Sequence, residues 1–343
     1  MLSKLNYNCL KELFSDQLVV VELARPLKQA LTSKLRALGG YIDGVDSDSI
    51  EIVLQKIEKE TVSKVFVDGS NMGEMVRALK TRFPDIEVCT FFHNVEVRFF
   101  YGSFRLNKSI HSLAVLVANY LAERKAVRYS DKIVCLSTRD SHLLQRVYGR
   151  PATHISAMAL EDKLPQDKRG QPTPRTEKFI LFVGGSFYAN SEGIKWFVKH
   201  VVPRISIKTC IVGRGLEDLK TELECNGGVE VVGAVDSLAD WYTKAQFIIA
   251  PIFDGSGMKT KVAEALMFGK KIVGTPEAFS GYGDDVDEAG WMCSTADDFV
   301  GAIGQAMDEE QVFFRRELRA LYEDKYSYRA ACERLKHIIG AID

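Results

Sequence analysis

A glycine-containing loop at the end of a buried strand, within residues 246–281, constrains this chain more than any other feature. An apolar run over residues 247–250 precedes the loop, which contains Gly255 and Gly257. Apolar residues then recur at helical spacing up to Gly269, and a second apolar run follows. The pattern predicts a strand, a loop, a helix and a second strand, which is the repeating unit of an α/β fold with a parallel sheet.

The loop has the composition of an anion-binding site. Gly255 and Gly257 allow backbone amides to approach a ligand closely, and the helix that follows presents the positive end of its dipole. Lys259 and Lys261 add two positive charges. Glu264 would repel a phosphate and is better suited to accept hydrogen bonds from neutral hydroxyls, such as those of a ribose. The alternative is an ordinary βαβ unit with a solvated lysine pair.

Two familiar phosphate-binding motifs do not fit the loop. The Gly-Ser-Gly-Met-Lys-Thr run at residues 255–260 lacks the Gly-Lys-Ser/Thr ending of a Walker A loop. The same run lacks the third glycine of a dinucleotide-binding fingerprint. Neither an adenosine triphosphatase loop nor a nicotinamide site is therefore indicated.

The stretch resembles the donor-site signature of group-1 glycosyltransferases with the GT-B fold. The matching positions are Pro251, Gly255, Ser256, Gly257, Met258, Lys259, Lys261, Val262, Glu264, Ala265, Leu266, Gly269, Lys270, Ile272, Val273, Gly274 and Thr275. The resemblance implies a nucleotide-sugar donor as substrate, a retaining transfer, and neither a required metal nor another cofactor. It also implies that Glu264 holds the donor ribose and that Lys259 holds the diphosphate.

The loop departs from the family pattern at one position. Many members carry two glutamates eight positions apart, and Ser256 stands where the first of them is expected. A subgroup with a Gly-x-Gly-x-Lys-x-Lys loop shares this absence. The departure weakens a catalytic role carried over from the family more than it weakens donor binding.

A second glycine turn matches the same subgroup independently. An apolar run over residues 179–183 leads into Gly184 and Gly185, and Asn190, Gly193 and a Trp-Phe pair follow at the subgroup's spacing. Paired glycines between a strand and a helix allow the backbone to approach a ligand closely. The turn therefore belongs on the donor side of the predicted site.

Two further turns complete the predicted donor site. Arg214 lies in a glycine turn after the strand predicted at 209–212, and Val235 follows the strand predicted at 229–233, where the family holds the base through backbone atoms. The catalytic candidates are His93, Lys259 and Glu264. The donor-binding candidates are Gly185, Ser186, Asn190, Gly213, Arg214, Val235, Gly255, Ser256, Gly257, Met258, Lys259, Thr260, Lys261 and Glu264.

The predicted fold class is α/β and GT-B-like, with two Rossmann-like domains facing a central cleft. At 343 residues the chain is long enough for two domains that each bury a core. We assign residues 1–160 to an acceptor-side domain, and 161–178, which is rich in proline and charge, to a linker. Residues 179–325 form the nucleotide-sugar-binding domain, and 326–343 a terminal helix that crosses back to the first domain.

The amino-terminal half is unusual for this family, because its pattern opens on a helix over residues 2–14. A buried strand is predicted at 18–23 and a helix at 26–38. The glycine-rich first strand unit of a GT-B domain is missing. Either it is absent from this sequence or the protein does without it, and we favour the first interpretation.

Polar residues follow the strand predicted at 86–92. Because ligands of open α/β sheets bind beyond the carboxyl ends of the strands, His93 is a candidate site residue. The run His93 to Glu96 also resembles the family, in which a histidine near the cleft contacts the transferring sugar. A histidine that only fixes the loop is the alternative. The acidic pair Asp46 and Asp48 is interpreted as a solvated turn rather than a metal site.

Residues 99–128 show the pattern of one long amphipathic helix. Its predicted apolar side contains Leu106, Ile110, Leu113, Val117 and Leu121, and six basic residues within 98–128 face a single acid, Glu123. A core helix with a solvated basic face is the simpler interpretation. The alternative is a peripheral contact of residues 98–128 with an anionic membrane surface that holds a lipid-linked acceptor.

Composition excludes several other classes. The net charge of −1 implies no attraction to nucleic acid, and there is no signal peptide or apolar run long enough to span a membrane. Seven scattered cysteines without a Cys-x-x-Cys pair argue against structural zinc and for a reducing compartment. We therefore expect a cytoplasmic protein that contacts the inner face of the membrane at most peripherally.

The predicted function is transfer of a sugar from a nucleotide sugar to a glycan or lipid-linked glycan, in surface polysaccharide biosynthesis. A different class remains open: a non-catalytic glycosyltransferase homologue that binds and stabilises an active partner, consistent with Ser256 and the missing first strand. A nucleotide-sugar epimerase on the same scaffold is a third reading, which the loop fits less well. The base, sugar, acceptor and linkage are set by loop shape, which sequence pattern does not show.

Overall fold

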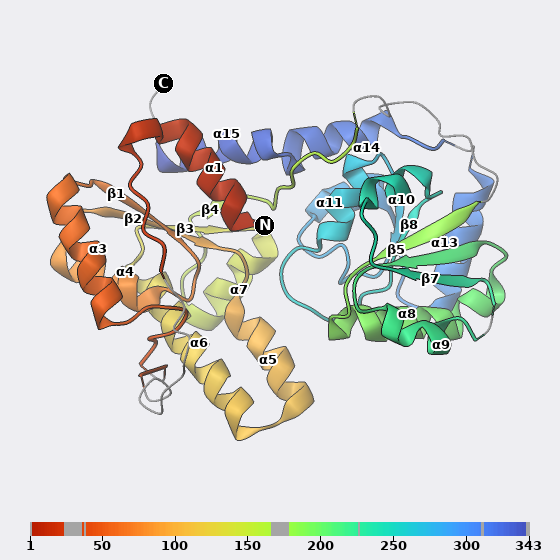
Figure 1. The fold of residues 1–343 in the computed structure, drawn as a ribbon, viewed down its shortest axis with the longest axis horizontal. Coiled ribbons are helices and arrows are strands. Elements are labelled where there is room, and N and C mark those ends of the chain that lie inside the picture. The colour runs from red at the N-terminus through yellow and green to blue at the C-terminus, as the bar shows by residue number, and fades with distance from the viewer. Residues whose placement is uncertain are drawn as a thin grey trace. The chain divides into compact units, whose positions relative to one another are not determined.

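The computed structural model describes residues 2–23, 36–37, 39–165, 178–225, 227–309 and 312–340. The chain divides into two compact units, each built on a parallel sheet flanked by helices (Figure 1). The amino-terminal unit contains Met1–Ala157 together with Ala331–Asp343. The carboxy-terminal unit contains Met158–Ala330.

The amino-terminal unit has a four-stranded sheet in the order β1-β2-β3-β4, with every pair parallel. The strands are β1 (Lys64–Asp68), β2 (Glu87–Phe92), β3 (Lys132–Cys135) and β4 (His154–Ile155). The helices include α1 (Leu2–Phe14), α3 (Ser47–Glu60), α4 (Gly73–Arg82) and α7 (Thr138–Tyr148). Apolar residues of α4 and the strands, among them Val76, Leu79 and Val88, are fully buried and form the core.

One of two local predictions in this unit needs correction. Residues 18–23 form no strand, and Val19, Val20 and Val21 are exposed, because this run does not pair with the edge strand β1. Asp46 is exposed, as predicted for a solvated turn, and its carboxylate also accepts the backbone N–H of Ser49 and caps α3. The helix predicted at 26–38 lies almost wholly outside the described residues.

The long helix predicted at 99–128 is two helices. α5 (Glu96–Asn107) and α6 (Ile110–Tyr129) pack side by side as a hairpin (Figure 1). Lys108 takes a positive φ of 29°, and Ser109 then caps α6 through reciprocal hydrogen bonds with Ser112. This capping box stabilises the start of a new helix at Ile110. The apolar spacing continues from α5 into α6, so the spacing alone does not reveal the chain reversal between them.

The buried face of α6 is also the reverse of the prediction. Small and polar residues of α6 face the unit's interior, whereas Leu113 and Val117 are exposed. The reason is close packing against α4: a Cβ at Gly73 would come within 1.8 Å of the Ala122 carbonyl oxygen. Only small side chains fit at such a helix contact.

The carboxy-terminal unit has a six-stranded sheet in the order β10-β9-β8-β5-β6-β7. Its strands are β5 (Phe179–Val183), β6 (Lys208–Val212), β7 (Val229–Gly233), β8 (Ile248–Ala250), β9 (Ile272–Gly274) and β10 (Gly290–Met292). Its helices include α8 (Tyr188–His200), α9 (Lys220–Leu223), α10 (Leu238–Lys244), α11 (Thr260–Met267), α12 (Val286–Ala289), α13 (Ala296–Asp308) and α14 (Arg316–Leu321). The central strands β5 and β8 are completely buried, as expected for a parallel sheet covered on both faces.

The strand order has a functional consequence. Counted from β5, the sheet follows the doubly wound order 3-2-1-4-5-6, and the order reverses between β5 and β8. Ligands of such sheets bind outside the carboxyl ends of the strands at this switch point. The loops after β5 and β8 therefore flank the expected ligand position.

Glycines let these loops approach each other. A Cβ at Gly193 on α8 would lie 1.8 Å from the Pro251 carbonyl oxygen, so the helix after β5 packs directly on the loop after β8. Gly213 has a φ of 151°, and its Cβ would lie 1.8 Å from the Gly184 carbonyl oxygen. Both glycines are therefore structural requirements of the loop cluster.

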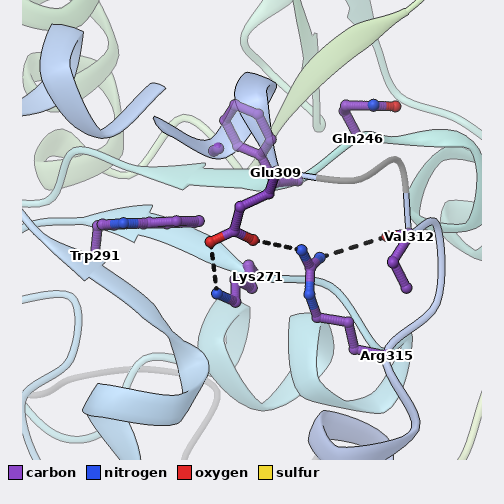
Figure 2. Close-up of a pocket in the computed structure, with 8 residues that line it drawn as sticks. Gln246, Lys271, Trp291, Glu309, Val312 and Arg315 are labelled. Carbon is purple, nitrogen blue, oxygen red and sulfur yellow. Dashed lines mark hydrogen bonds and ion pairs between the residues drawn. The ribbon is translucent and has the colours of Figure 1, made fainter. Parts of the chain in front are cut away.

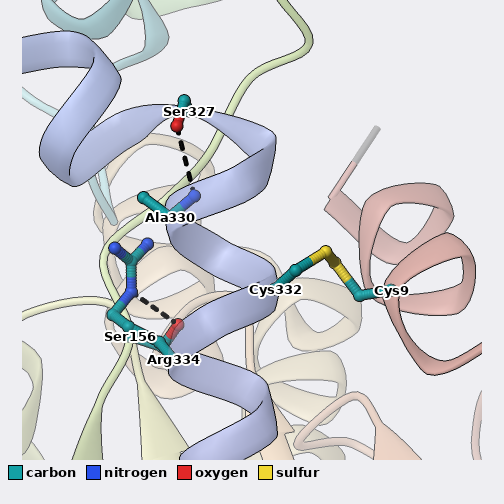
Figure 3. Close-up of a disulfide and its surroundings, with 6 residues drawn as sticks. All are labelled: Cys9, Ser156, Ser327, Ala330, Cys332 and Arg334. Carbon is teal, nitrogen blue, oxygen red and sulfur yellow. Dashed lines mark hydrogen bonds between the residues drawn. A yellow bond between two sulfur atoms is a disulfide. The ribbon is translucent and has the colours of Figure 1, made fainter. Parts of the chain in front are cut away.

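The end of the chain returns to the amino-terminal unit. Ser327 precedes helix α15 (Tyr328–Ile339), and its Oγ accepts the N–H of Ala330; a disulfide joins Cys332 of this helix to Cys9 of α1 (Figure 3). Lys132 of β3 donates to the Ile338 carbonyl oxygen at 2.8 Å. The scattered spacing of the seven cysteines did not indicate this pair.

Two remaining regions complete the comparison with the sequence. Of the predicted linker 161–178, residues 166–177 lie outside the described residues. Asp285 accepts hydrogen bonds from Lys325 and the Tyr326 hydroxyl, whereas the nearby acids Asp287 and Glu288 are exposed. No helix in the described part of the chain is both long and apolar enough to cross a membrane.

Candidate functional site

A side-chain hydrogen bond joins the segments on the two sides of the switch point. Lys261 Nζ in the first turn of α11 donates to Asn190 Oδ1 on α8 at 2.8 Å. Asn190 Nδ2 in turn donates to the Gly185 carbonyl oxygen at 2.9 Å. Three residues predicted from separate stretches of sequence are thus brought together at the carboxyl ends of β5 and β8.

The Lys261 ammonium is buried, which changes its acid–base behaviour. Burial lowers the pKa of Lys261 to about 8; the Glu264 carboxylate partly opposes this, and Lys259 adds to the lowering. The side chain also lies over the Phe182 ring, 5.4 Å from its centroid. A buried cation with few solvent contacts interacts strongly with an anion that enters its site.

Lys259 has a carboxylate partner in this structure. Its Nζ donates to Glu277 Oε1 at 2.8 Å and to the Gly257 carbonyl oxygen at 2.9 Å. The Tyr282 hydroxyl donates to the Lys259 carbonyl oxygen at 2.7 Å and also accepts the N–H of Ala263 at 3.1 Å. The backbone at the start of α11 is therefore held in place from inside the unit.

The loop before α11 has the backbone geometry of an anion site. Gly255 and Gly257 take φ angles of 142° and 65°, which side-chain-bearing residues rarely adopt. Lys259 is the N-cap residue, and its own side chain does not cap the helix. Ser256 and Thr260 are half-buried, and Met258 is buried beneath the loop. The positive end of α11 therefore lies next to two lysines.

Glu264 is oriented by a buried tyrosine. The Tyr242 hydroxyl of α10 donates to Glu264 Oε2 at 2.8 Å, and the Tyr242 ring stacks on Phe268 at a centroid distance of 4.9 Å. Burial and the Glu264 charge raise the pKa of Tyr242 well above its usual value, so it stays a proton donor. One carboxylate oxygen remains to accept from another group.

The other predicted donor residues occupy the neighbouring turn. Ser186 N–H donates to the Arg214 carbonyl oxygen at 3.1 Å, and Gly213 N–H donates to the Gly233 carbonyl oxygen at 2.8 Å. The Arg214 side chain is exposed, and Val235 is half-buried beyond the end of β7. These residues lie along the same sheet edge as the lysine pair, and their donor-binding roles stay predictions.

His93 belongs to a hydrogen-bonded group in the amino-terminal unit. Its Nε2 lies 2.9 Å from Asp68 Oδ1, and Asn6 of α1 donates to the same oxygen at 2.8 Å. Burial alone would raise the pKa of Asp68. The hydrogen bond and charge of His93, together with the hydrogen bond from the Asn6 amide, have a larger opposite effect, so the pKa of Asp68 lies below its usual value. Asp68 therefore remains a carboxylate that fixes the His93 ring.

A buried carboxylate lies at the start of the following helix. Glu123 of α6 is fully buried and accepts the N–H groups of Glu96 and Val97 at 2.8 and 3.2 Å and the Tyr148 hydroxyl at 2.7 Å. It is thus a cap for α5 rather than a surface counterion. Burial and the nearby Glu123 charge raise the pKa of Glu96 to about 7.

A surface hollow in the carboxy-terminal unit is separate from this site (Figure 2). Phe247 and Lys271 line it, and they directly precede β8 and β9, at the amino ends of the strands. Its charges already form pairs, because Glu309 binds both Lys271 and Arg315. The hollow therefore lies at the sheet edge opposite to the one that binds ligands in this fold.

Comparisons with known proteins agree with this architecture. The structure of HepE from Anabaena in complex with UDP has a TM-score of 0.63 at 10% identity, over 86% of this chain and 82% of that one. A glycosyltransferase from Rickettsia africae gives 0.63 at 13% identity, over 96% and 87%. The lipopolysaccharide outer core galactosyltransferase WaaB gives 0.57 at 13% identity, over 85% and 79%. The fold is GT-B.

The sequence itself supports the same family over part of its length. Residues 177–309 match the family model described as glycosyl transferases group 1, and this range contains every predicted donor-binding residue. HepE has also been solved with UDP-glucose. No curated protein sequence matches the chain.

Sequence reasoning missed the side chains that hold the site. Tyr242, Glu277 and Tyr282 fix Glu264, Lys259 and the α11 backbone, yet no local motif marks them. Asp68 carried a weak signal, since it is the last residue of β1 and His93 directly follows the neighbouring strand β2. Polar residues at the carboxyl ends of two adjacent parallel strands are expected to meet.

Proposed function

We propose that this protein is a glycosyltransferase that moves a sugar from a nucleotide-sugar donor to a glycan or lipid-linked glycan, in the assembly of a surface polysaccharide. One observation carries the proposal. Two lysines, the start of helix α11 and an oriented carboxylate gather at the switch point of a GT-B carboxy-terminal unit. The family match over residues 177–309 supports the same assignment.

The chemistry follows from the charges of these groups. As the bond between sugar and diphosphate breaks, negative charge develops on the leaving diphosphate. Lys259, Lys261 and the amides near Gly257 stabilise that charge without a metal ion. Glu264, held by Tyr242, accepts hydrogen bonds from the ribose hydroxyls. Because HepE binds UDP and UDP-glucose, a uridine nucleotide is the first donor to test.

His93 would contact the transferring sugar. Asp68 fixes its ring, and a fixed imidazole hydrogen-bonds a hydroxyl in one orientation. Retention of configuration rests on the family resemblance. Ser256 is a poor nucleophile for such a step, since a hydroxyl needs an adjacent base to become reactive.

A non-catalytic partner protein is the second candidate. Ser256 at the usual glutamate position favours it, and so does the pairing of Lys259 with Glu277, which neutralises one of the two predicted phosphate ligands. Such a protein would stabilise an active glycosyltransferase without turning over a donor itself. Weak or absent donor binding is its distinguishing property.

Calorimetric titration of the protein with UDP and the other nucleoside diphosphates, in the presence of a chelator, tests the proposal. We expect one diphosphate to bind and Lys259→Ala to abolish binding. Lys199→Ala, which changes an exposed lysine of the same unit, is the matched control and should bind normally. A folded protein that binds none of the diphosphates would favour the partner-protein function. Donor turnover without an acceptor would instead indicate an epimerase.

A further inference from the structure

The α5–α6 hairpin carries a row of aliphatic side chains that face solvent. Leu106 is 65% exposed, Ile110 89%, Leu113 44% and Val117 38%. Ile110, Leu113 and Val117 are three and four residues apart, so they lie on one face of α6, and Leu106 lies at the adjoining end of α5. Tyr101 of α5 is 53% exposed as well.

The fold of the unit does not explain this row. The opposite face of α6 provides the internal contacts through Ser112, Ala118, Ala122 and Ala126, which are buried. That face packs so closely on α4 that Gly73 has no room for a Cβ. A helix in water normally buries its large aliphatic residues and exposes its small ones. α6 does the reverse, so the aliphatic row is suited to a partner outside the unit.

The charges around the row indicate what kind of partner it is. Between Val97 and Ala122 the sequence contains no aspartate or glutamate, whereas Arg98, Arg105 and Lys108 are basic. Arg105 and Lys108 are exposed and lie next to Leu106 and Ile110. Glu123, the nearest acid on α6, is buried under the start of α5.

We infer that the hairpin tip, residues 105–117, docks on the surface of a bilayer that contains anionic lipids. Aliphatic side chains at the end of a helical hairpin can enter the boundary between headgroups and acyl chains, while flanking basic groups bind lipid phosphates. The hairpin tip combines exposed aliphatic side chains with basic side chains and contains no acids. This combination fits the surface of an anionic bilayer better than the groove of a protein, which would offer carboxylates or hydrogen-bonding partners. The inference concerns a surface outside the donor site and does not depend on the proposed function.

Vesicle co-sedimentation of the full-length protein tests the inference. We expect binding to phosphatidylcholine vesicles that contain about 30% phosphatidylglycerol and little binding to pure phosphatidylcholine, because each basic residue near an anionic surface contributes about fivefold. The double variant L106S/I110S should bind at least about tenfold more weakly, since burial of each aliphatic side chain contributes roughly that factor. The variant R105Q/K108Q should bind the anionic vesicles about 25-fold more weakly, and its remaining binding should depend less on salt.

The control is the double variant I52S/K56Q on α3, which removes an exposed isoleucine and an exposed lysine from the same unit. It should bind as the unaltered protein does. Unchanged thermal unfolding of all variants shows that the fold is intact, because every altered side chain is exposed. Equal binding of the unaltered protein and L106S/I110S to anionic vesicles would overturn the inference. So would sedimentation velocity showing a dimer that L106S/I110S dissociates, because the row would then be an interface between two copies.

Discussion

Lys261 and Asn190 lie 71 residues apart in the sequence, and their side chains form a 2.8 Å hydrogen bond across the switch point of the sheet. This bond fixes the loop after β5 against the helix that follows β8. The Lys261 ammonium is thereby oriented before any ligand binds, so little side-chain entropy is lost on binding. Four predictions follow from this site and from the unit that carries His93.

The first prediction is a pH dependence of diphosphate binding. Burial lowers the pKa of Lys261 to about 8, and an anion binds the charged form. As pH rises through this value the free protein loses the charge, and binding then requires uptake of a proton. Affinity should therefore fall about tenfold between pH 7 and pH 9. Titration calorimetry over this range measures the effect.

Lys261→Met is the matched variant, since it keeps the length of the side chain and removes the ammonium. It should bind weakly at every pH and show no fall between pH 7 and pH 9. A constant affinity of the unaltered protein over this window would mean that Lys261 does not contact the diphosphate.

The second prediction concerns Glu277, which forms an ion pair with Lys259 at 2.8 Å. An incoming diphosphate has to compete with this carboxylate. Glu277→Gln keeps a hydrogen-bond acceptor but removes the charge, so diphosphate affinity should increase about fivefold. Glu192→Gln, an exposed change on α8, should leave affinity unchanged. Weaker binding by Glu277→Gln would show instead that Glu277 is needed to orient Lys259.

The sequence allowed the loop chemistry to be predicted because that chemistry is local. Glycines with positive φ, lysines at the helix start and Glu264 one turn later all fall within ten residues, and their spacing defines their relation. Tyr242 and Glu277 could not be predicted in the same way. Their contacts depend on how α10 and the segment after β9 pack around α11, and no periodicity within one element records such packing.

The α5–α6 region shows a different limit. Apolar spacing at Leu106, Ile110, Leu113 and Val117 predicted a helix correctly, but it placed the wrong side in the core. The apolar periodicity shows only that one face of the helix differs in polarity from the other. Which face is buried depends here on the close approach of α4 at Gly73, which lies far away in the sequence. The chain reversal at Lys108 was missed because its Asn-Lys-Ser signal is weak.

The third prediction tests Asp68 as a positioning residue that acts through His93. Asp68→Asn should lower kcat for sugar transfer about tenfold or more, because the ring loses the carboxylate that fixes it. Diphosphate affinity should not change, since that site lies in the carboxy-terminal unit. Asp48→Asn, an exposed change in the same unit, should have normal kcat.

A double-variant cycle separates positioning from simple destabilisation. If Asp68 acts only through His93, adding Asp68→Asn to His93→Ala should cause no further loss of kcat. Additive losses would indicate that Asp68 has a separate role. Unchanged kcat in both single variants would exclude His93 from the reaction.

The fourth prediction concerns the Cys9–Cys332 disulfide, which joins α1 to α15 across a sequence separation of 323 residues. A cross-link that closes so long a loop restricts the unfolded chain and stabilises the fold by about 2–4 kcal/mol. Cys9→Ser should therefore lower the Tm, and reductant should lower the Tm of the unaltered protein but not of Cys9→Ser. Cys225→Ser, which removes an exposed free thiol, is the control and should respond to reductant as the unaltered protein does.

Because α1 also carries Asn6, which donates to Asp68, the reduced protein should lose transfer activity before it loses diphosphate binding. Thiol titration of the denatured, unreduced protein checks the starting point: five reactive thiols, the seven cysteines less the paired two, are expected, and seven would show that the bond does not form.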